Sequence, residues 1–295
     1  MSATWQAWND WVGGKRGFVL APGVYDALSA KVAAHIGFDA LYMTGFGTAA
    51  SLGLPDVGLA TLTEMAANVG RIVEASGLPL IADADTGYGN PINVGRTVRS
   101  YERAGAAGLH IEDQVFPKKC GFFEGKQVIP AEEHVQKVKA ACDARNDDHF
   151  VIIARTDALA VNGWDDVVER VGLYREAGAD LVFVDGIRST DDLDAYVQKV
   201  VKAGLPALYN GALVPAARAE ALGFRVQICG GSHGIAYYAM RSALLGVKQN
   251  GKPPSGPLIE ATAWLEDEVP AITDVLGLPD IYTLERQYGR YGPDA

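Results

Sequence analysis

The chain has 295 residues, 48% of them apolar, and its 26 basic and 36 acidic side chains leave a net charge of −10. This composition can bury a large core, and the negative charge argues against a general affinity for nucleic acid or anionic membranes. Three cysteines do not form a disulfide framework, and no run is long and apolar enough to span a membrane, so we expect a cytoplasmic protein.

Eight short β-rich runs follow one another along the chain, each ending in a polar or glycine cluster. They cover residues 18–21, 40–43, 78–83, 108–112, 150–155, 181–185, 206–210 and 225–229. The segments before the second, third and fourth runs carry helical spacing. Continuous apolar strands are covered on both faces, which is typical of parallel βαβ units. Eight such units predict a (β/α)8 TIM barrel, with a doubly wound open sheet as the alternative.

The two ends of the chain carry apolar stripes outside these units. We expect Trp5, Trp8 and Trp11 to form a packing surface. After residue 233 the chain is helical again, with the amphipathic segments GIAYYAMRSALLGV and IEATAWLEDEV. We therefore treat residues 1–295 as one barrel domain with residues 234–295 as a helical extension. These helices either contact another subunit or cover their own barrel.

Polar side chains gather where the predicted strands end, which is where a TIM barrel places its chemistry. In chain order they are Asp83 and Asp85, Glu112 and Asp113, Arg155 and Asp157, Asp185, and Asn210. Crowded carboxylates in a partly dry cavity repel one another, so we expect a cation between them. Oxygen ligands without histidine or cysteine at metal spacing indicate Mg²⁺, with Mn²⁺ as an alternative. The alternative interpretation is that Asp83 and Asp85 bind no ion and only cap the turn that follows them.

Glycines after the second strand suit the binding of an anion. TGFGTAAS offers backbone N–H groups around Gly45 and Gly47, and Arg155 can hold a carboxylate through two hydrogen bonds. The same glycines superficially match a dinucleotide fingerprint, but glycine and proline in residues 53–58 interrupt any immediate helix. CGGSHG after the last strand is also compatible with a phosphate-binding loop, so a phosphorylated or phosphonate substrate stays an alternative.

Cys120 lies in the loop EDQVFPKKCGFFEGK, which follows the fourth strand. Its glycines and charges suit a mobile lid over the mouth of the barrel. Neighbouring lysines favour a thiolate, which can transfer protons as well as attack carbon. Spacing alone leaves an inert thiol and a catalytic thiol both open. Cys142 and Cys229 are expected in the core.

EDQVFPKKCG, with DADTGYGN upstream and ARTDA downstream, resembles the isocitrate lyase and phosphoenolpyruvate mutase superfamily. The likeness runs from Pro22 to about Gly186, and the KKCG loop is similar to the lyase branch, which includes methylisocitrate lyase and 2,3-dimethylmalate lyase. The resemblance implies an α/β barrel, a homotetramer with C-terminal helices swapped between subunits, and Mg²⁺ at Asp83, Asp85 and Glu112.

The resemblance also implies a reaction, the retro-Claisen cleavage of a 2-hydroxy dicarboxylic acid to an α-keto acid and a second carboxylic acid. Cys120 would protonate the enolate and Arg155 would stabilise its charge, with Lys118 and Tyr42 as further catalytic candidates. The candidates for substrate binding are Thr44, Gly45, Phe46, Gly47, Asp56, Phe122, Arg155, Asp185 and Asn210.

Three positions depart from the lyase pattern. Phe122 stands where histidine is usual, Asp185 where glutamate is usual, and the segment after Asn210 lacks a glutamate. The lost histidine and glutamate, and the carboxylate shortened at Asp185, would have served the distal end of the substrate, which favours a 2-alkylmalate-like acid over a tricarboxylic one. The alternatives are oxaloacetate decarboxylation or hydrolysis, phosphonopyruvate chemistry, or a non-catalytic protein that binds small diacids.

Overall fold

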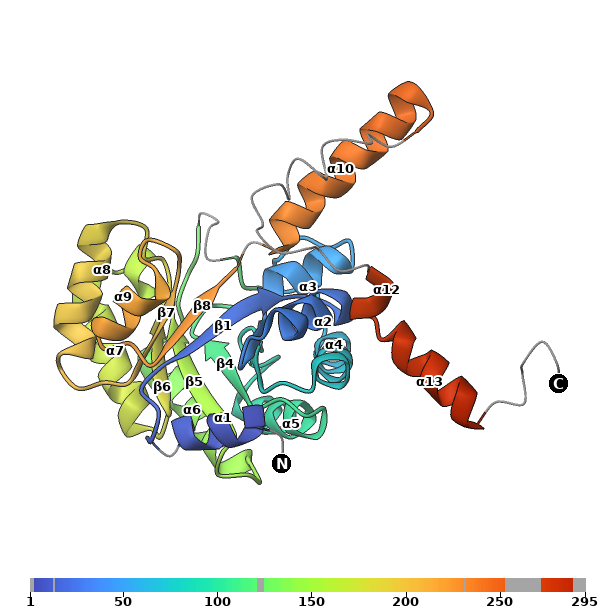
Figure 1. Cartoon of the computed structure of the whole chain (residues 1–295). Coiled ribbons are helices and arrows are strands. Elements are labelled where there is room, and N and C mark those ends of the chain that lie inside the picture. Colours follow the sequence, from blue (N-terminus) through green and yellow to red (C-terminus); the bar gives the residue numbers. More distant parts are fainter. Residues whose placement is uncertain (1–2, 13, 121–124, 231, 253–271, 289–295) are drawn as a thin grey trace. The chain divides into compact units, whose positions relative to one another are not determined.

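The computed structural model describes residues 3–12, 14–120, 125–230, 232–252 and 272–288. The chain divides into two compact units, Met1–Gly231 and Ser232–Ala295. Figure 1 labels their helices and strands.

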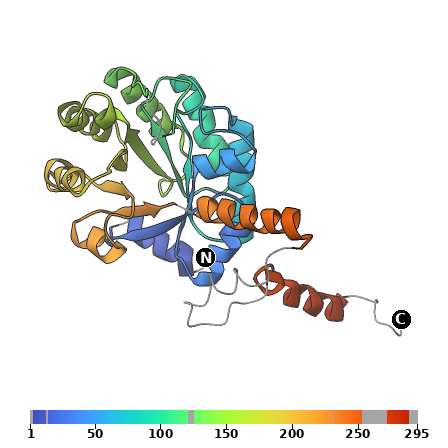
Figure 2. The same cartoon turned by 90° about the horizontal axis from the view of Figure 1, so that it is seen from above.

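The first unit is a closed barrel of eight parallel strands, in which β1 pairs with both β2 and β8. The strands are β1 (Val19–Val24), β2 (Leu41–Met43), β3 (Leu80–Asp83), β4 (Gly108–Glu112), β5 (Val151–Thr156), β6 (Leu181–Val184), β7 (Ala207–Asn210) and β8 (Val226–Cys229). In Figure 2 the strands form an inner ring and the helices surround it. The predicted TIM barrel is confirmed, and the open sheet is excluded.

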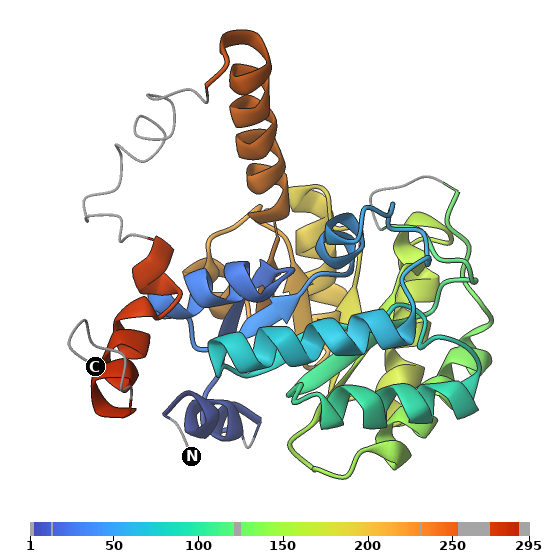
Figure 3. The same ribbon diagram turned by 90° about the vertical axis from the view of Figure 1, so that its right-hand side faces the viewer.

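Helices connect successive strands on the outside of the barrel. They are α2 (Ala27–Ile36), α3 (Gly45–Ser51), α4 (Leu62–Ser76), α5 (Pro91–Arg103), α6 (Ala131–Ala144), η1 (Ala158–Ala160), α7 (Trp164–Glu176), α8 (Thr190–Tyr196), η2 (Val197–Val201) and α9 (Ala216–Ala221). Local sequence sets their starts: Thr61 and Glu64 form a capping box on α4, and Asn90 caps α5 ahead of Pro91. Figure 3 shows α4 and α5 against the outside of the strands.

The glycine-rich stretch after β2 is a helix, so the expectation that glycine and proline prevent one there is wrong. Thr44 caps α3, with its Oγ1 accepting from the Gly47 N–H at 3.3 Å. Gly53, with a φ of 75°, follows the end of the helix. The glycine and proline of residues 53–58 therefore limit the helix to seven residues rather than prevent it.

Helix α1 (Ala3–Val12) covers the amino ends of the strands. Trp8 and Trp11 are each 2% exposed and pack with the apolar side chains at the base of the barrel. The Trp11 indole donates to the carbonyl of Arg225, just before β8, at 3.1 Å. The tryptophan stripe is thus a packing surface, as predicted, and the opposite end of the barrel is the one left for chemistry.

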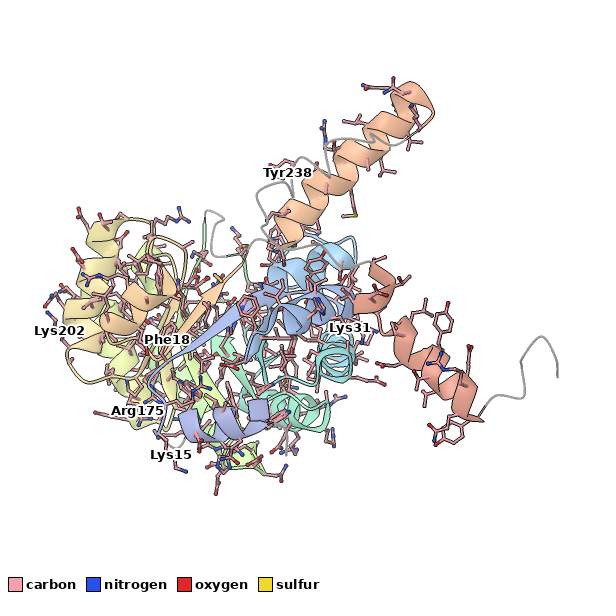
Figure 4. All side chains as sticks on the ribbon, viewed as in Figure 1. Lys15, Phe18, Lys31, Arg175, Lys202 and Tyr238 are labelled. Atoms are coloured by element: carbon pink, nitrogen blue, oxygen red, sulfur yellow. The ribbon has the colours of Figure 1, made fainter. Side chains whose placement is uncertain are left out.

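The second unit contains α10 (Ser232–Asn250), α12 (Ile272–Val275) and α13 (Leu278–Tyr288). Helix α10 confirms the first predicted C-terminal helix, whereas the second predicted segment, residues 259–269, lies outside the described residues. Large apolar side chains of α10 are exposed, including Ile235 at 74% and Tyr238, labelled in Figure 4, at 71%. Among the described residues, no helix combines the length and apolarity needed to cross a bilayer.

Candidate active site

The acids of β3 and β4 meet at the carboxyl end of the barrel and are almost completely buried. Asp83 is 4% exposed, Asp85 5% and Glu112 0%. Asp83 accepts a hydrogen bond from the Asp85 N–H at 2.9 Å through Oδ1, and another from the Gly45 N–H at 3.2 Å through Oδ2. A Cβ atom at position 45 would collide with the Asp83 carboxylate, so this close approach requires glycine. The loops after β2 and β3 are thereby joined at the predicted mouth.

The amides predicted to bind an anion already have protein acceptors. The Gly45 N–H donates to Asp83 and the Gly47 N–H to the Thr44 hydroxyl. Phe46 between them is 36% exposed. A substrate oxygen that used these two N–H groups would therefore have to displace a carboxylate or a hydroxyl.

Glu112 is the carboxylate with the fewest partners in the mouth. Neither of its oxygens has a hydrogen-bond donor among the described residues, although Arg155 Nε lies 3.2 Å from Oε2. Burial raises the pKa of Glu112 well above its usual value, and Arg155 offsets only part of this effect. A buried carboxylate with so few donors is suited to a cation.

Lys118 supplies positive charge beside these acids. Its side chain is 2% exposed, its ammonium forms an ion pair with Asp56, and it lies 2.9 Å from Asp85 Oδ1. Burial raises the pKa of Asp85 to about 6, an effect that Lys118 opposes and that the Asp83 charge strengthens. Burial also opposes ionisation of Asp83, but His110, Lys118 and Arg155 together lower its pKa. The predicted residues Lys118, Asp56, Asp83 and Asp85 thus form one electrostatic cluster.

Arg155 occupies the other side of the mouth. Its Nε and Nη2 donate to the two oxygens of Asp157 at 2.9 and 3.1 Å, and Nη2 lies 3.1 Å from Asp185 Oδ2. Asn210 donates to Asp185 Oδ1 at 3.4 Å. Burial works against ionisation of Asp157, yet Arg155 and Lys126 lower its pKa to about 2. The edge of Arg155 that sequence analysis reserved for a substrate carboxylate is therefore occupied by Asp157.

Tyr42 lies deeper in the barrel, with its hydroxyl 3.0 Å from His110 Nε2 and 3.5 Å from Asp83 Oδ2. Burial raises the pKa of Tyr42 well above its usual value and lowers that of His110 to about 4. Both side chains are therefore neutral near pH 7. Sequence analysis missed His110, although strand alternation places it on the same side of β4 as Glu112.

Asp113 does not join the acidic cluster, because alternation along the strand turns it outward. Its Oδ2 accepts from Thr156 and Tyr174, both at 2.7 Å, and from Arg170 at 3.2 Å. It therefore braces β4 against β5 and α7. The expectation that Asp113 shares the mouth is wrong.

Cys120 is 6% exposed and lies beside the mouth. Its N–H donates to the carbonyl of Asp56 at 3.1 Å, and the preceding Lys119 exchanges two hydrogen bonds with Gln114 at 2.8 and 2.9 Å. The thiol is thus carried by a segment tied to the same aspartate that pairs with Lys118. Phe122 and the rest of residues 121–124 lie outside the described residues.

The other cysteines are partly buried, Cys142 on α6 and Cys229 at the end of β8. Burial raises the pKa of both thiols. The prediction that both side chains lie in the core is thus confirmed only in part, because neither is fully buried.

The described side chains do not form a ready-made chelate of three or more histidine, cysteine, aspartate or glutamate residues. Mg²⁺ does not require one, because it keeps several of its waters and often binds one or two carboxylates directly. The donor-poor oxygens of Glu112 and the carboxylates of Asp83 and Asp85 are hard ligands of the kind this ion prefers. The residues present therefore fit a hydrated divalent cation.

Comparison with known proteins supports one family. The family model described as phosphoenolpyruvate phosphomutase matches residues 14–248. The chain is 43% identical over 275 residues to the 2,3-dimethylmalate lyase of Eubacterium barkeri, with coverage of 92% of this chain and 93% of the relative.

Solved structures give the same result. The crystal structure of 2,3-dimethylmalate lyase superposes with a TM-score of 0.85 at 40% identity, covering 98% of this chain and 96% of that one. Oxaloacetate acetylhydrolase in complex with 3,3-difluorooxalacetate superposes with a TM-score of 0.86 at 36% identity, covering 98% of each chain. With the matching family model and the closed barrel, these likenesses show that the chain belongs to the phosphoenolpyruvate mutase and isocitrate lyase superfamily.

Proposed function

We propose that this protein is a Mg²⁺-dependent carbon–carbon lyase that cleaves a 2-hydroxy dicarboxylic acid of the 2-alkylmalate type. The observation that carries the proposal is the meeting of Asp83, Asp85 and Glu112 with Lys118 and Arg155 at one buried mouth. Similarity to a 2,3-dimethylmalate lyase over nine-tenths of the chain supports the same reaction class.

Cleavage needs a base for the hydroxyl proton and charge stabilisation for the enolate that forms when the C–C bond breaks. When bound, Mg²⁺ would be held through Asp83, Asp85 and Glu112 and would supply Lewis-acid stabilisation of negative charge. Asp56 and Asp85 keep Lys118 positively charged at the mouth. Its pKa is well above the usual value because Asp85, Glu112, Asp83 and Asp56 outweigh the effect of burial, so Lys118 acts as a fixed charge.

Cys120 is the proposed proton donor to the enolate carbon. Its backbone is fixed to the Asp56 carbonyl, which places the thiol segment beside Lys118. Retro-Claisen cleavage releases an α-keto acid from the carbon that carried the hydroxyl, and the other fragment gains one proton and leaves as a carboxylic acid.

The proposed substrate follows from the distal side of the mouth. Asp185 is paired with Arg155 and accepts from Asn210, so it has little capacity left to recognise further polar groups of a substrate. A substrate with an alkyl group there loses less hydration than one with a third carboxylate. This supports a dicarboxylic rather than a tricarboxylic acid.

The test is incubation of the purified protein with Mg²⁺ and a panel comprising malate, 2-methylmalate, 2,3-dimethylmalate and 2-methylisocitrate. We expect α-keto acid release to be fastest from an alkylmalate. Binding of these acids without product from any of them would instead indicate a non-catalytic diacid-binding protein.

Oxaloacetate hydrolysis is the second candidate, favoured by the likeness to oxaloacetate acetylhydrolase over 98% of each chain. Adding oxaloacetate to the same panel separates the two, because hydrolysis gives oxalate and acetate whereas an alkylmalate gives an α-keto acid. Phosphonopyruvate in the panel tests the phosphonate reaction through release of phosphate.

We also propose that the protein assembles as a homotetramer through its C-terminal helices. The exposure of Ile235, Tyr238 and Leu244 on α10 supports this proposal, since large apolar side chains in such number commonly mark an interface. Light scattering coupled to size exclusion measures the mass of the assembly, and a monomer would contradict it.

A further inference from the structure

Four charged side chains meet beside the ends of β5 and β6 and alternate in sign around a closed ring. Asp157 accepts from Arg155 Nε and Nη2 at 2.9 and 3.1 Å, and from Lys126 Nζ at 2.8 Å. Lys126 Nζ also lies 3.8 Å from Asp185 Oδ2. Asp185 Oδ2 in turn lies 3.1 Å from Arg155 Nη2, which closes the ring.

The ring is shielded from solvent. The side chain of Lys126 is 3% exposed, that of Asp157 0%, and those of Arg155 and Asp185 8% each. Two cations and two anions leave no net charge in it. Removal of one member would leave an uncompensated charge of the opposite sign, which is costly at a buried site.

Lys126 comes from a different part of the chain than the other three members. Arg155 and Asp157 lie at the end of β5 and Asp185 follows β6, whereas Lys126 belongs to the segment between β4 and α6. Without its ammonium group, the ring would carry one net negative charge. That charge would repel an anionic substrate and would bind the guanidinium group of Arg155 more tightly to the two aspartates.

The orientation of Arg155 is fixed by its surroundings. Its guanidinium carbon lies 5.1 Å from the centre of the Phe183 ring, and Asp157 is itself held by a 3.0 Å bond from its N–H to Asp113 Oδ1. Among the described residues, Arg155 donates hydrogen bonds through Nε and Nη2. Nη1 is the nitrogen that these bonds leave for a substrate oxygen.

We propose that Lys126 is a positioning residue: by neutralising Asp157 and Asp185, it leaves Arg155 able to hold the second carboxylate of a 2-hydroxy diacid. This inference rests on the proposed function for the class of ligand. Its test uses binding, which is measured separately from turnover.

The experiment compares malate with lactate, which lacks only the second carboxylate of malate. Titration calorimetry in buffer with Mg²⁺ gives the ratio of their dissociation constants for the wild-type protein and for Lys126→Met. This ratio does not depend on the fraction of active protein, so it separates positioning from general damage. Lys202→Met is the control, because Lys202 lies on the outer surface of the barrel and contacts Gln198 (Figure 4).

We expect wild-type protein to prefer malate and Lys126→Met to lower that preference about 10-fold, with little change in lactate affinity, because the unneutralised negative charge acts on the second carboxylate that only malate carries. Lys202→Met should keep the wild-type ratio. If Lys126→Met does not fold, Asp157→Asn tests the same charge balance with the opposite sign, because it leaves the ring with one net positive charge and little change in shape. It should keep or raise the preference for malate, and a lower preference would overturn the inference.

A wild-type ratio in folded Lys126→Met, or a wild-type protein that does not distinguish malate from lactate, would overturn the inference. In the double variant Lys126→Met/Asp157→Asn, we expect the ratio to return to within about 2-fold of the wild-type value, because Arg155 and Asp185 are left as a pair without net charge. Failure of the proposed function looks different, since malate would bind with the expected ratio while no acid of the panel is cleaved.

Discussion

The two ends of the barrel are built from different kinds of side chain. At the amino ends of the strands, Trp8 and Trp11 pack on apolar neighbours. At the carboxyl ends, buried carboxylates face buried cations, and Glu112 has no hydrogen-bond donor among the described residues. Apolar burial stabilises a fold, whereas buried charges cost stability unless they are well paired. Apolar packing at the base therefore stabilises the fold, whereas the buried charges at the mouth lower its stability and supply the groups for chemistry.

Glu112→Gln, at the mouth, should give the largest difference between the effect on activity and the effect on stability. The substitution removes one of the three carboxylates proposed to hold Mg²⁺, so we expect activity to fall about 1,000-fold through the loss of the charge stabilisation that the ion would supply. The melting temperature should stay level or rise, because the pKa of Glu112 shows that its charged form is unfavourable here. Product assays and thermal unfolding check this pair of outcomes. A parallel loss of activity and stability would contradict the view that the mouth and the base serve different purposes.

Trp11→Ala makes the opposite change at the base. Loss of this buried indole and of its bond to the Arg225 carbonyl should lower the free energy of unfolding by about 3–4 kcal/mol. The kcat of the protein that remains folded should be unchanged, because Trp11 lies at the other end of the barrel from the acids. Urea unfolding and single-temperature kinetics measure the two quantities, and a selective fall in kcat would count against the comparison.

Cys120→Ser tests the proposed proton donor at the mouth. We expect turnover to fall about 100-fold, within the usual range for loss of a general acid, while the melting temperature stays close to that of the wild type. Cys142→Ser is the matched control, since Cys142 lies on α6 and outside the mouth. Equal activity of the two variants would show that the thiol of Cys120 is inert.

The smallest expected effect is at His134, which lies in the helix layer between the two ends of the barrel. It is fully buried against Tyr174, and burial lowers its pKa to about 3, far below the value in an unfolded chain. Its contribution to stability is therefore present above about pH 6.5 and is lost as the pH falls, at about 1.4 kcal/mol per pH unit. Urea unfolding between pH 5 and 7 should show a shallower slope for His134→Phe than for the wild type.

Sequence pattern predicted the barrel because its strands are continuous apolar runs, and a closed barrel makes their carboxyl ends converge. The eight strands lie within three residues of their predicted bounds, and Asp83, Asp85, Glu112, Arg155 and Asp185 meet as expected. Alternation along β4 could also have separated Glu112 from Asp113 and revealed His110.

The pairing of the lysines was beyond sequence analysis. Lys118 and Lys126 belong to the loop that the sequence predicts as a mobile lid, and in the structure they are buried against Asp56 and Asp157, respectively. The partners are 62 and 31 residues away in the chain. Only the closed barrel brings these segments together, so no local pattern marks them.

The most direct test of the proposed enolate is cleavage in D₂O, followed by NMR of the carboxylic acid product. Protonation of an enolate by Cys120 predicts a single deuteron at the carbon that was bonded to the hydroxyl-bearing carbon, with formation of this product stopped by removal of Mg²⁺. Cleavage that gives an acid without solvent deuterium, or that proceeds at the full rate in excess chelator, would contradict the account.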